Sequence, residues 1–556
     1  MEGSSIYCSL PTPLPIADSG EPTPFSQEFI RISKQQLIGY TSEIAYWKSM
    51  HAREIERGKK KDQKLEEAHA RIRDLVHRLF GRKSEKKKTH SESQSWDSKP
   101  SRPRGQQKGS KGHGRKAPQN LPIIEKELDF LEGENACPQC HRPFQPLPGT
   151  EDSDFIEIEV KAHIRRFHRK RYTPTCHCEN LPGIMTAPMP PRLFNRNTLG
   201  ISVWVEALLD KYLYARATHR LLQLFSTLNL DIAEGTITDG FKRMLPLFQP
   251  LLDAHHRQQM TESLFMGDET RWQVFETIEG KIGHRWYLWV FTSQSVVYYI
   301  VAPGRDAGVP IEHFGKMDET KESAVLVCDR YSAYKKMARE LDYFLLAFCW
   351  VHVRRDFLEA ARSYPEHEIW MLSWVEKIGE LYHINKQRVT LWDDEIALHL
   401  QSTEFGQQQH RLEFCLSSME QRRDECLRDE KNLDTVQKKV LTSLKDHWPG
   451  LILFADNPQI PMDNNESERN VRKGVIARNN YFGSGSQWSA QLLATMLTLM
   501  QTLLRWKINP RHWLFAYLSC CAENKGQAPD DLSPFLPWEM DEERKQFLSQ
   551  APPPDT

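Results

Sequence analysis

The chain has 556 residues, and its 74 Lys and Arg residues balance its 74 Asp and Glu residues at a formal net charge of zero. No stretch approaches the roughly 20 consecutive apolar residues that a membrane-spanning helix needs, and the first residues lack the basic and apolar segments of a signal peptide. We therefore expect a cytoplasmic protein of several domains, whose 11 cysteines are thiols or metal ligands rather than disulfides.

The N-terminal third changes character three times. Residues 1–26 are rich in Pro and Ser and are predicted to be disordered. Residues 27–82 contain recurring apolar residues and charges of alternating sign, which is typical of an exposed helix or of a self-associating coiled coil. Residues 83–120 form a Gly-, Ser- and Pro-rich linker. Between Arg82 and Lys116 there are twelve basic residues against three acidic ones, so this linker either contacts a polyanion such as DNA or is a solubilising spacer.

Two close pairs of cysteines follow the linker. Cys137 and Cys140 stand in "CPQC", and Cys176 and Cys178 stand in "CHC" about forty residues later. Four thiolates in two pairs can hold a tetrahedral Zn²⁺ ion, so residues 121–182 are predicted to form a small zinc-binding domain.

The second cysteine pair is tighter than usual, which leaves His141 or His177 as an alternative fourth ligand. The segment between the pairs alternates as strands do and is strongly basic, so we expect a hairpin whose basic face contacts DNA. Its candidate DNA-binding residues are Arg165, Arg166, Arg169, Lys170 and Arg171.

Residues 183–262 are predicted to be helical. The segment "YARATHRLLQLFSTLNLDIAEGTITDGFKRM" places two helices around a short turn. The pattern is compatible with a DNA-binding helix-turn-helix, although a plain packing module fits it better.

From residue 264 the pattern changes to strands, in "LFMGDETRWQVFE", "HRWYLWVFTS", "SVVYYIVAP" and "SAVLVCD". Asp268 lies inside the first run and Asp329 ends the last one. A carboxylate in a core strand is costly without a partner or a cation, so the two acids are candidate ligands of a divalent metal. Asp329 has a second explanation, because an acid at a strand end often caps the next helix.

A third acid is expected in "MDNNESERNVRKGVIARNN", where Asp463 or Asn464 can cap a new helix. Glu466 and Glu468 are two residues apart, so they point to different faces of this helix and only one can face a metal site. The arginines that follow can bind DNA phosphate, and they are Arg469, Arg472 and Arg478.

Asp329 and Glu468 are 139 positions apart, which is too far for a simple connection, and two long helical patterns lie between them. We therefore predict an α-helical insertion at residues 361–455. In "CWVHVRRDF", Cys349 and His352 have metal-like spacing without a second pair nearby. This spacing favours packing, or positioning near the site, over a zinc ion.

In their order and spacing, several motifs resemble the large transposase of the insertion sequence 66 family of bacterial mobile elements. They run from about residue 78 to 538 and are "FGRKSEK", "GHGRKAP", "CPQC", "GDETRW", "CDRYSAY", "CWVHVRRDF", "DNNESERNVR" and "LPW". The resemblance implies an α/β fold whose RNase H-like, mixed-sheet core comprises residues 263–360 and 456–518, followed by a C-terminal tail at 519–556.

The resemblance also implies the chemistry. It selects Glu468 rather than Glu466 and gives a catalytic triad of Asp268, Asp329 and Glu468. These residues would hold two Mg²⁺ or Mn²⁺ ions for DNA cleavage and strand transfer. The implied partners are the terminal inverted repeats of the element, target DNA, further copies of the chain and accessory element-encoded proteins, at the bacterial nucleoid. A catalytically inactive DNA-binding protein and an RNase H-like nuclease or resolvase are the alternatives.

The cysteine pairs lead to a direct test. Protein purified without chelator is expected to contain about one zinc ion per chain, and Cys137→Ser or Cys140→Ser should remove it. Metal analysis by mass spectrometry measures the content, with Cys415→Ser as the control. Zinc-free wild-type protein would contradict the prediction.

Overall fold

The computed structural model describes residues 33–80, 139, 142, 160–173, 175, 184–195, 197–276, 285–317, 323–396, 401–429 and 432–549. The chain divides into two compact units, Met1–Lys87 and Lys88–Thr556. The basic linker at 83–120 and the four cysteines of the predicted zinc site lie outside the described residues. No helix in the described part is long and apolar enough to cross a membrane.

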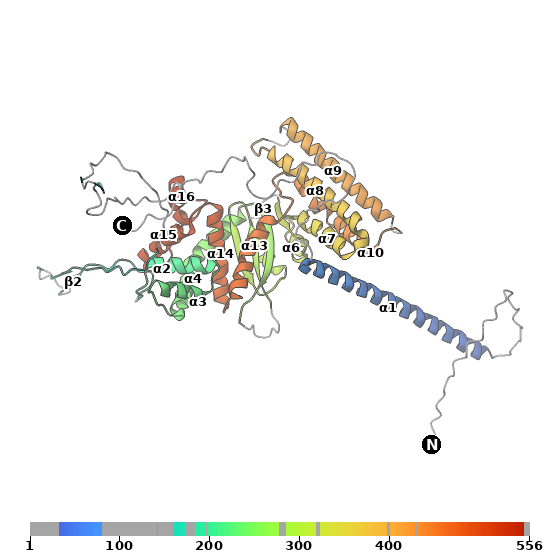
Figure 1. Ribbon diagram of the computed structural model, residues 1–556, viewed down its shortest axis with the longest axis horizontal. Helices are drawn as coiled ribbons and strands as arrows, with labels where there is room; N and C mark the ends of the chain where they lie inside the picture. Colours follow the sequence, from blue (N-terminus) through green and yellow to red (C-terminus); the bar gives the residue numbers. More distant parts are fainter. Residues whose placement is uncertain are drawn as a thin grey trace, which may run out of the picture. The chain divides into compact units, whose positions relative to one another are not determined.

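The first unit contains a single described element, the 47-residue helix α1 (Lys34–Phe80; Figure 1). Its sequence has no proline, which would interrupt the helical hydrogen bonds. Oppositely charged residues one turn apart, such as Glu56 and Lys60 at 3.5 Å, give it modest local support. Almost all of its side chains are exposed.

The second unit contains the remaining elements. Its strands are β1 (Arg171–Tyr172), β2 (Met185–Thr186), β3 (Leu264–Trp272), β4 (Trp286–Thr292), β5 (Val297–Ala302), β6 (Ala324–Cys328) and β7 (Phe344–Phe348). Its α-helices are α2 (Ile201–Leu208), α3 (Thr218–Thr227), α4 (Glu234–Met260), α5 (Gly308–Phe314), α6 (Ser332–Glu340), α7 (Trp350–Ser363), α8 (Glu368–Thr390), α9 (Thr403–Arg428), α10 (Thr435–Asp446), α11 (Trp448–Leu451), α12 (Leu453–Asp456), α13 (Asn465–Tyr481), α14 (Gln487–Arg505), α15 (Pro510–Glu523) and α16 (Glu542–Ser549). A π-helical turn, Leu209–Leu213, continues α2, and 3₁₀ turns occur at Pro365–His367 and Ser533–Phe535.

The centre of this unit is a mixed five-stranded sheet with the order β5-β4-β3-β6-β7. The pairs β5–β4 and β4–β3 are antiparallel, whereas β3–β6 and β6–β7 are parallel. The mixed sheet and the α/β class agree with the prediction, and four of the five strands coincide with the predicted runs. The short strand β7 was not predicted.

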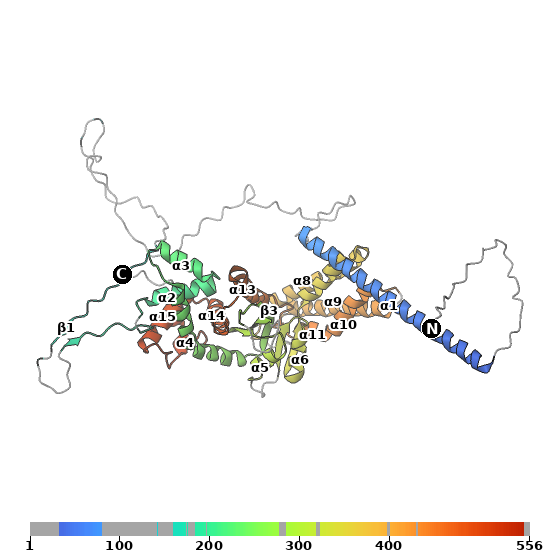
Figure 2. The same ribbon diagram turned by 90° about the horizontal axis from the view of Figure 1, so that it is seen from below.

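Helices cover both faces of the sheet (Figures 1 and 2). On β4, Leu288 and Val290 join the core that includes α13 and α14, whereas Trp289 and Phe291 join the core that includes α5 and α6. Successive residues of a strand point to opposite faces, so this alternation fixes which side of the sheet each neighbouring residue of β3 occupies. We call the side of α13 and α14 the α13 face.

Between β7 and α13 the chain forms helices α7 to α12, in the region of the predicted insertion. Their apolar core includes three sheet residues, Met266, Val327 and Ala347. The helical region is therefore packed on the sheet and does not form a core of its own.

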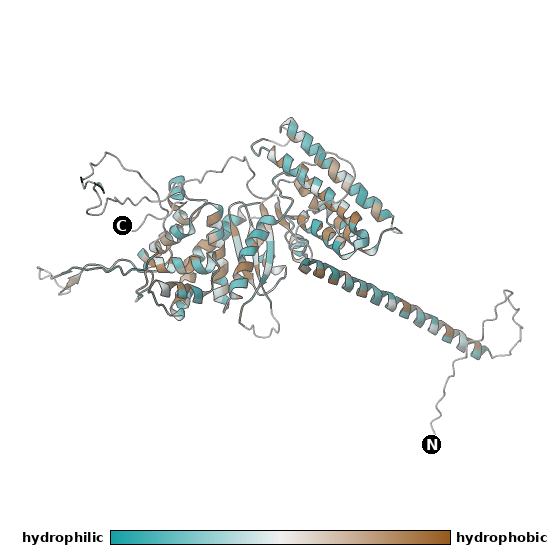
Figure 3. Cartoon of the chain, in the orientation of Figure 1, coloured by the Kyte–Doolittle hydropathy of each residue, from teal (hydrophilic) through white to brown (hydrophobic). Residues whose placement is uncertain are grey.

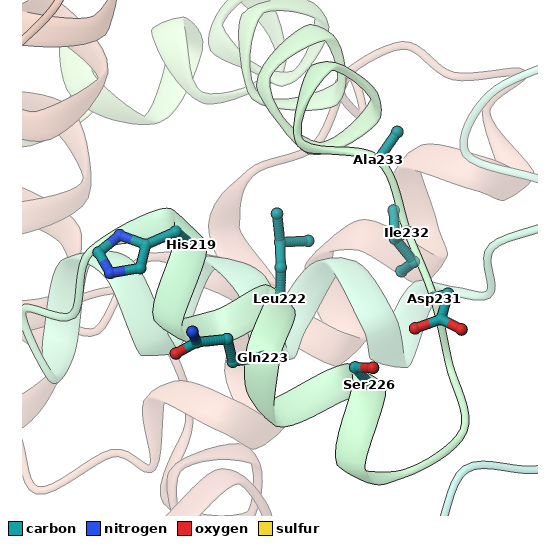
Figure 4. Close-up of a pocket in the computed structure, with 7 residues that line it drawn as sticks. All are labelled: His219, Leu222, Gln223, Ser226, Asp231, Ile232 and Ala233. Atoms are coloured by element: carbon teal, nitrogen blue, oxygen red, sulfur yellow. The ribbon is translucent and has the colours of Figure 1, made fainter.

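The helices α3 and α4 occupy the segment with the helix-turn-helix pattern. Leu221 and Phe225 of α3 are buried in the core that includes α4 and α14, which is what a packing module requires. An open pocket lies between α3 and the connection to α4 (Figure 4). Its lining residues are His219, Leu222, Gln223, Ser226, Asp231, Ile232 and Ala233.

The basic hairpin predicted between the cysteine pairs is mostly not formed in the described residues. Residues 160–170 have no regular structure, and only Arg171–Tyr172 pairs, antiparallel, with Met185–Thr186. All of residues 160–173 are exposed. Because no face of the segment is buried, its alternating pattern has no core to set a strand register.

The close contact between α13 and β4 allows a stability test. A Cβ atom added at Gly474 would lie 2.3 Å from Cδ2 of Leu288, which is fully buried. Gly474→Ala should therefore lower the free energy of unfolding by about 1–3 kcal/mol, despite the better helix propensity of alanine. The matched control is Gly379→Ala in α8, where a Cβ meets nothing within 4 Å. This substitution should stabilise by roughly 0.5–1 kcal/mol in the same denaturant titration.

Candidate active site

The strand register brings the first two acids together. In the parallel pair of β3 and β6, Met266 lies opposite Val327. Two residues further along each strand stand Asp268, still within β3, and Asp329, directly after β6. The register therefore predicts that the two side chains are neighbours on adjacent strands and point to the same face of the sheet.

Asp268 and the next residue, Glu269, serve opposite faces of the sheet. Asp268 lies opposite Val290 of β4 and so belongs to the α13 face, whereas Glu269 lies opposite Trp289. Both acids are on the same short stretch of β3, but only Asp268 is turned toward the helix that carries Glu468.

Two side chains attach the start of α13 to β3. The Asn464 side-chain amide donates a hydrogen bond to the Gly267 carbonyl at 2.6 Å, and the Ser467 hydroxyl donates to the Met266 carbonyl at 3.3 Å. Both Asn464 and Ser467 are buried. These bonds end directly before Asp268, so they bring the first turn of α13, with Glu468, to that carboxylate.

The cap of α13 differs from the expectation that Asp463 or Asn464 uses its side chain to cap the helix. Asn464 has the N-cap position but makes no side-chain cap bond, because its amide is turned to β3. Asp463 accepts from the backbone N–H of Asn465 at 3.1 Å, in a local turn. Instead of capping the helix, the Asn464 side chain positions it.

The two glutamates of α13 point to different surroundings. Glu466 forms an ion pair with Arg505 of α14. Glu468 lies 3.9 Å from Nε2 of His352 and 3.9 Å from the guanidinium of Arg355, both on α7. Distances of 3.9 Å are too long for hydrogen bonds, so only the charge of Arg355 attracts Glu468, whereas Glu466 has a direct partner.

Asp329 has a local structural role besides its place in the cluster. Its Oδ1 atom accepts the backbone N–H of Tyr331 at 2.9 Å. The N-cap residue of α6 is Tyr331, so Asp329 shapes the turn into α6 but is not its cap. The sequence also suggested that Asp329 caps the next helix. The structure shows only this turn, which precedes the cap residue Tyr331.

The electrostatics of Asp268 reflect a crowded acidic site. Burial, together with the negative charges of Glu269, Glu468 and Asp329, raises the pKa of Asp268 from 3.8 to about 8. The backbone N–H of Glu269 donates a hydrogen bond to Asp268, which opposes this shift only in part. Without a cation, the carboxyl group of Asp268 is therefore largely protonated at neutral pH.

His352 stands beside this cluster in a neutral form. Burial, together with the charge of Arg355, lowers its pKa, although Asp329 and Glu468 act in the opposite direction. Its Nδ1 atom is buried without a hydrogen-bond partner. The neighbouring Cys349 accepts the backbone N–H of Asn464 at 3.3 Å. The "CWVH" segment thus contacts the start of α13. Burial raises the pKa of Cys349 to about 11, which keeps it a thiol.

The sequence analysis missed Glu269, whose side chain is only 2% exposed. It accepts hydrogen bonds from Arg305 at 2.8 Å and from the hydroxyl of Tyr334 at 2.5 Å. Burial raises its pKa, and these two donors counteract the shift. Two adjacent acids in a buried strand were the available signal, because the second must face the opposite side and needs its own partners.

The three carboxylates do not close around a point. Among the described residues, no three His, Cys, Asp or Glu side chains are close enough together to hold a metal ion. The donor set nevertheless suits a hard divalent cation, since it consists of carboxylate oxygens on one face of the sheet. Asn464 adds a buried Oδ1 atom that has no hydrogen-bond partner.

The predicted DNA-binding residues fall into two groups. Arg469 and Arg472 of α13 are exposed, as are the five predicted residues of the 160–173 segment. Arg478 instead donates hydrogen bonds to the Thr270 hydroxyl, at 3.2 Å, and to the Arg271 carbonyl. Its guanidinium therefore already attaches α13 to β3.

Two of the three predicted acids thus lie on adjacent strands of a mixed sheet and the third on the neighbouring helix α13, and the comparisons with known proteins specify the family. The family described as Transposase IS66 family matches residues 197–492, just over half of the chain. The chain belongs to this family.

Two curated relatives from Sinorhizobium fredii (strain NBRC 101917 / NGR234) carry the names uncharacterized protein y4jD and uncharacterized protein y4hP. The first is 24% identical over 76% of this chain and 82% of its own length, and the second is 23% identical over 75% of each. Among solved structures, a pre-cleavage Mos1 transpososome is 14% identical with a TM-score of 0.12, covering 29% of this chain and 60% of that one. A TM-score this low supports no conclusion about this fold.

The raised pKa of Asp268 leads to a pH prediction for metal-free protein. A carboxyl group with a higher pKa in the folded state destabilises that state once it must ionise, so the cost grows between pH 4 and 8. Asp268→Asn should therefore raise the free energy of unfolding by about 1–3 kcal/mol at pH 8 and change it little at pH 4. Denaturant titrations in EDTA at both pH values measure this, and an equal effect at pH 4 and 8 would contradict it.

Proposed function

We propose that this chain is a DDE transposase that cleaves the ends of a bacterial insertion sequence and joins them to target DNA. Its mixed sheet would be the RNase H-like core, with Asp268, Asp329 and Glu468 as the catalytic carboxylates. The chain's family membership carries the proposal, together with the strand register that sets Asp268 beside Asp329 and the bond that holds the start of α13 on β3. Burial and the charges of Glu269, Glu468 and Asp329 raise the pKa of Asp268, so Asp329 and Glu468 both act on it although they are 139 positions apart.

Two divalent cations, Mg²⁺ or Mn²⁺, would supply activation of the attacking oxygen and stabilisation of the leaving oxygen in an in-line displacement. Asp268 and Asp329 would hold them from adjacent strands, and Glu468 from α13. The pKa of Asp268, raised by burial and by the neighbouring acids, favours a bound cation that would stabilise its ionised form.

Other residues of the chain would orient these carboxylates. Asn464 fixes the start of α13 on β3 at 2.6 Å, which sets the distance of Glu468 from Asp268. His352 and Arg355 stand 3.9 Å from Glu468 on its other side. We assign them as positioning residues, because they limit the directions in which the Glu468 side chain can turn.

The exposed basic residues would bind the DNA. Arg469 and Arg472 project from the same helix as Glu468, and the 160–173 segment adds a basic strip with exposed aromatic residues, Phe167 and Tyr172. Contacts of this kind are to phosphates and are sensitive to salt. The predicted zinc-binding domain at 121–182 would complete the recognition of the terminal repeats, and the protein would act at the nucleoid.

The two glutamates of α13 provide the test. Glu468→Gln should lower strand transfer by at least about a hundredfold, because a neutral amide removes an anionic metal ligand. Glu466→Gln should retain most activity, because its carboxylate pairs with Arg505 of α14. Strand transfer is measured with a labelled terminal-repeat duplex in Mg²⁺ and in Mn²⁺.

Both variants must melt normally and bind the same duplex in a gel-shift assay. The matched pair separates the catalytic role from a general effect of charge at a helix start, which would affect both positions alike. Equal activity of the two variants, or loss only at position 466, would remove Glu468 from the mechanism. DNA binding without any strand transfer by wild-type protein would support the inactive DNA-binding alternative.

A further inference from the structure

The helix α13 presents a row of exposed side chains that begins beside the candidate active site. Four exposed residues of this helix recur every three or four positions, so they lie on one side of it. A fifth exposed residue follows directly after the helix ends. We call these five residues the α13 row, and they are Arg469, Arg472, Ile476, Asn479 and Phe482.

The charges on the surface of α13 suit a polyanion. Its exposed charged residues are Arg469, Arg472 and Lys473, all of them basic, whereas Glu466 and Glu468 are partly buried. Most residues of α13 are hydrophilic, unlike those of its neighbour α14 (Figures 1 and 3). Glu468 lies one turn before Arg472, so a DNA strand that reaches the carboxylates would have the two arginines beside its next phosphates.

Phe482 combines exposure with an unfavourable backbone conformation. It is 73% exposed, and its φ is 68°. A positive φ is strained for a bulky side chain, and glycine is the usual residue at the end of a helix in this conformation. The chain has a glycine at the next position, Gly483. Neither burial nor backbone preference explains the phenylalanine, which points to a function for its ring.

Bonds on both sides of Phe482 hold it at a fixed place. The Asn480 side-chain amide donates a hydrogen bond to the Ala215 carbonyl at 2.8 Å. After the phenylalanine, the backbone N–H of Ser484 donates to the Gln273 carbonyl at 2.8 Å. The ring therefore projects from an anchored segment, and a ligand that contacts it pays little conformational entropy for ordering the chain.

We propose that Phe482 stacks on an unpaired DNA base while Arg469 and Arg472 bind the adjoining phosphates. This inference rests on the proposed function of the chain. Phe482 is 14 positions after Glu468. At the helical rise this spacing is about 20 Å, or about six nucleotides of a DNA strand. Every base has an aromatic face, so the contact selects an unpaired base rather than a sequence.

The experiment measures DNA binding by the full chain with fluorescence anisotropy, in EDTA so that no catalysis takes place. Two duplexes of one terminal-repeat sequence are compared. One is fully paired, and the other has a short mismatched stretch about six nucleotides from the cleaved end. The wild-type protein should bind the mismatched duplex roughly tenfold more tightly. Phe482→Leu should remove this preference and Phe482→Trp should keep it, because only an aromatic ring can stack on a base. Arg472→Ala should weaken binding to both duplexes alike.

The matched control is Phe275→Leu. Phe275 is 59% exposed, and its backbone N–H donates to the carbonyl of Ser484, two residues after Phe482, at 2.9 Å. The preceding Val274 is buried in the core on the α13 face, so Phe275 points to the other side. Phe275→Leu should therefore retain the preference for the mismatched duplex.

A stability measurement separates a stacking role from a structural one. Phe482→Gly removes the ring and relieves the backbone, so the denaturant midpoint should stay the same or rise while the preference is lost. A lower midpoint would indicate a structural residue and overturn the proposal. No preference in the wild-type protein, full preference in Phe482→Leu, or equal loss in Phe275→Leu would also overturn it.

A second pair of duplexes with an unrelated sequence identifies the source of the base. A preference on the terminal repeat alone would support stacking on a base of the element end, and a preference on both pairs would support stacking on target DNA as well. Because these measurements exclude catalysis, a wild-type protein that shows the preference but no strand transfer would contradict the proposed function and leave this inference standing.

Discussion

The contact on which the candidate site depends is the hydrogen bond from the Asn464 side chain to the Gly267 carbonyl. It joins residues 197 positions apart at 2.6 Å, between buried groups. A strand in the middle of a sheet normally directs its carbonyls to neighbouring strands, so an amide from α13 at this position requires α13 to approach β3 closely. The glycine serves the opposite face, where a Cβ at position 267 would lie 3.3 Å from Leu326 and Phe291 in the core of α5 and α6. Asp268 directly follows Gly267 in β3. The contact therefore brings the first turn of α13, with Glu468, toward Asp268.

Adjacent acids on β3 illustrate how a single strand serves two environments. Glu269 accepts hydrogen bonds from Arg305 and Tyr334, which offset part of the cost of its burial on the face of α5 and α6. Asp268 accepts one backbone hydrogen bond and has three acidic neighbours, Glu269, Glu468 and Asp329, so its burial is only partly compensated within the chain. The difference lies in the partners rather than in the residue type. A partly compensated buried carboxylate among like charges is the arrangement expected of a site that binds a cation.

Much of this arrangement could be predicted from local patterns, and the parts that could not depend on distant partners. The runs that became β3, β4, β5 and β6 are long and rich in aromatic and β-branched residues, which identifies them without further information. The strand β7 has only five residues, "FLLAF", directly before "CWVH", and a short apolar run of that kind cannot be told from the start of a helix. Asn464 was expected to cap α13, because its sequence position is that of a cap; its bond to Gly267 depends on a contact that no local pattern encodes. The hairpin predicted at residues 160–173 was wrong for a different reason. The sequence alternates as a strand does, but no face of the segment is buried, so most of it forms no strand.

The two ends of the helical insertion lie together beside the sheet, which explains how Glu468 comes close to β3 after a long stretch of chain. The chain leaves the sheet at Cys349 and Trp350 and returns at Met462 and Asn464. The departing and returning segments are bonded to each other, since Trp350 N–H donates to the Met462 carbonyl at 2.9 Å and Asn464 N–H donates to Cys349 Sγ at 3.3 Å. The entropic cost of closing a loop rises only with the logarithm of its length, so a closed base of this kind tolerates a long insertion. The position of Glu468 is then set by the base of the insertion and by β3, and the helices α8 to α10 can differ in length without displacing the carboxylate.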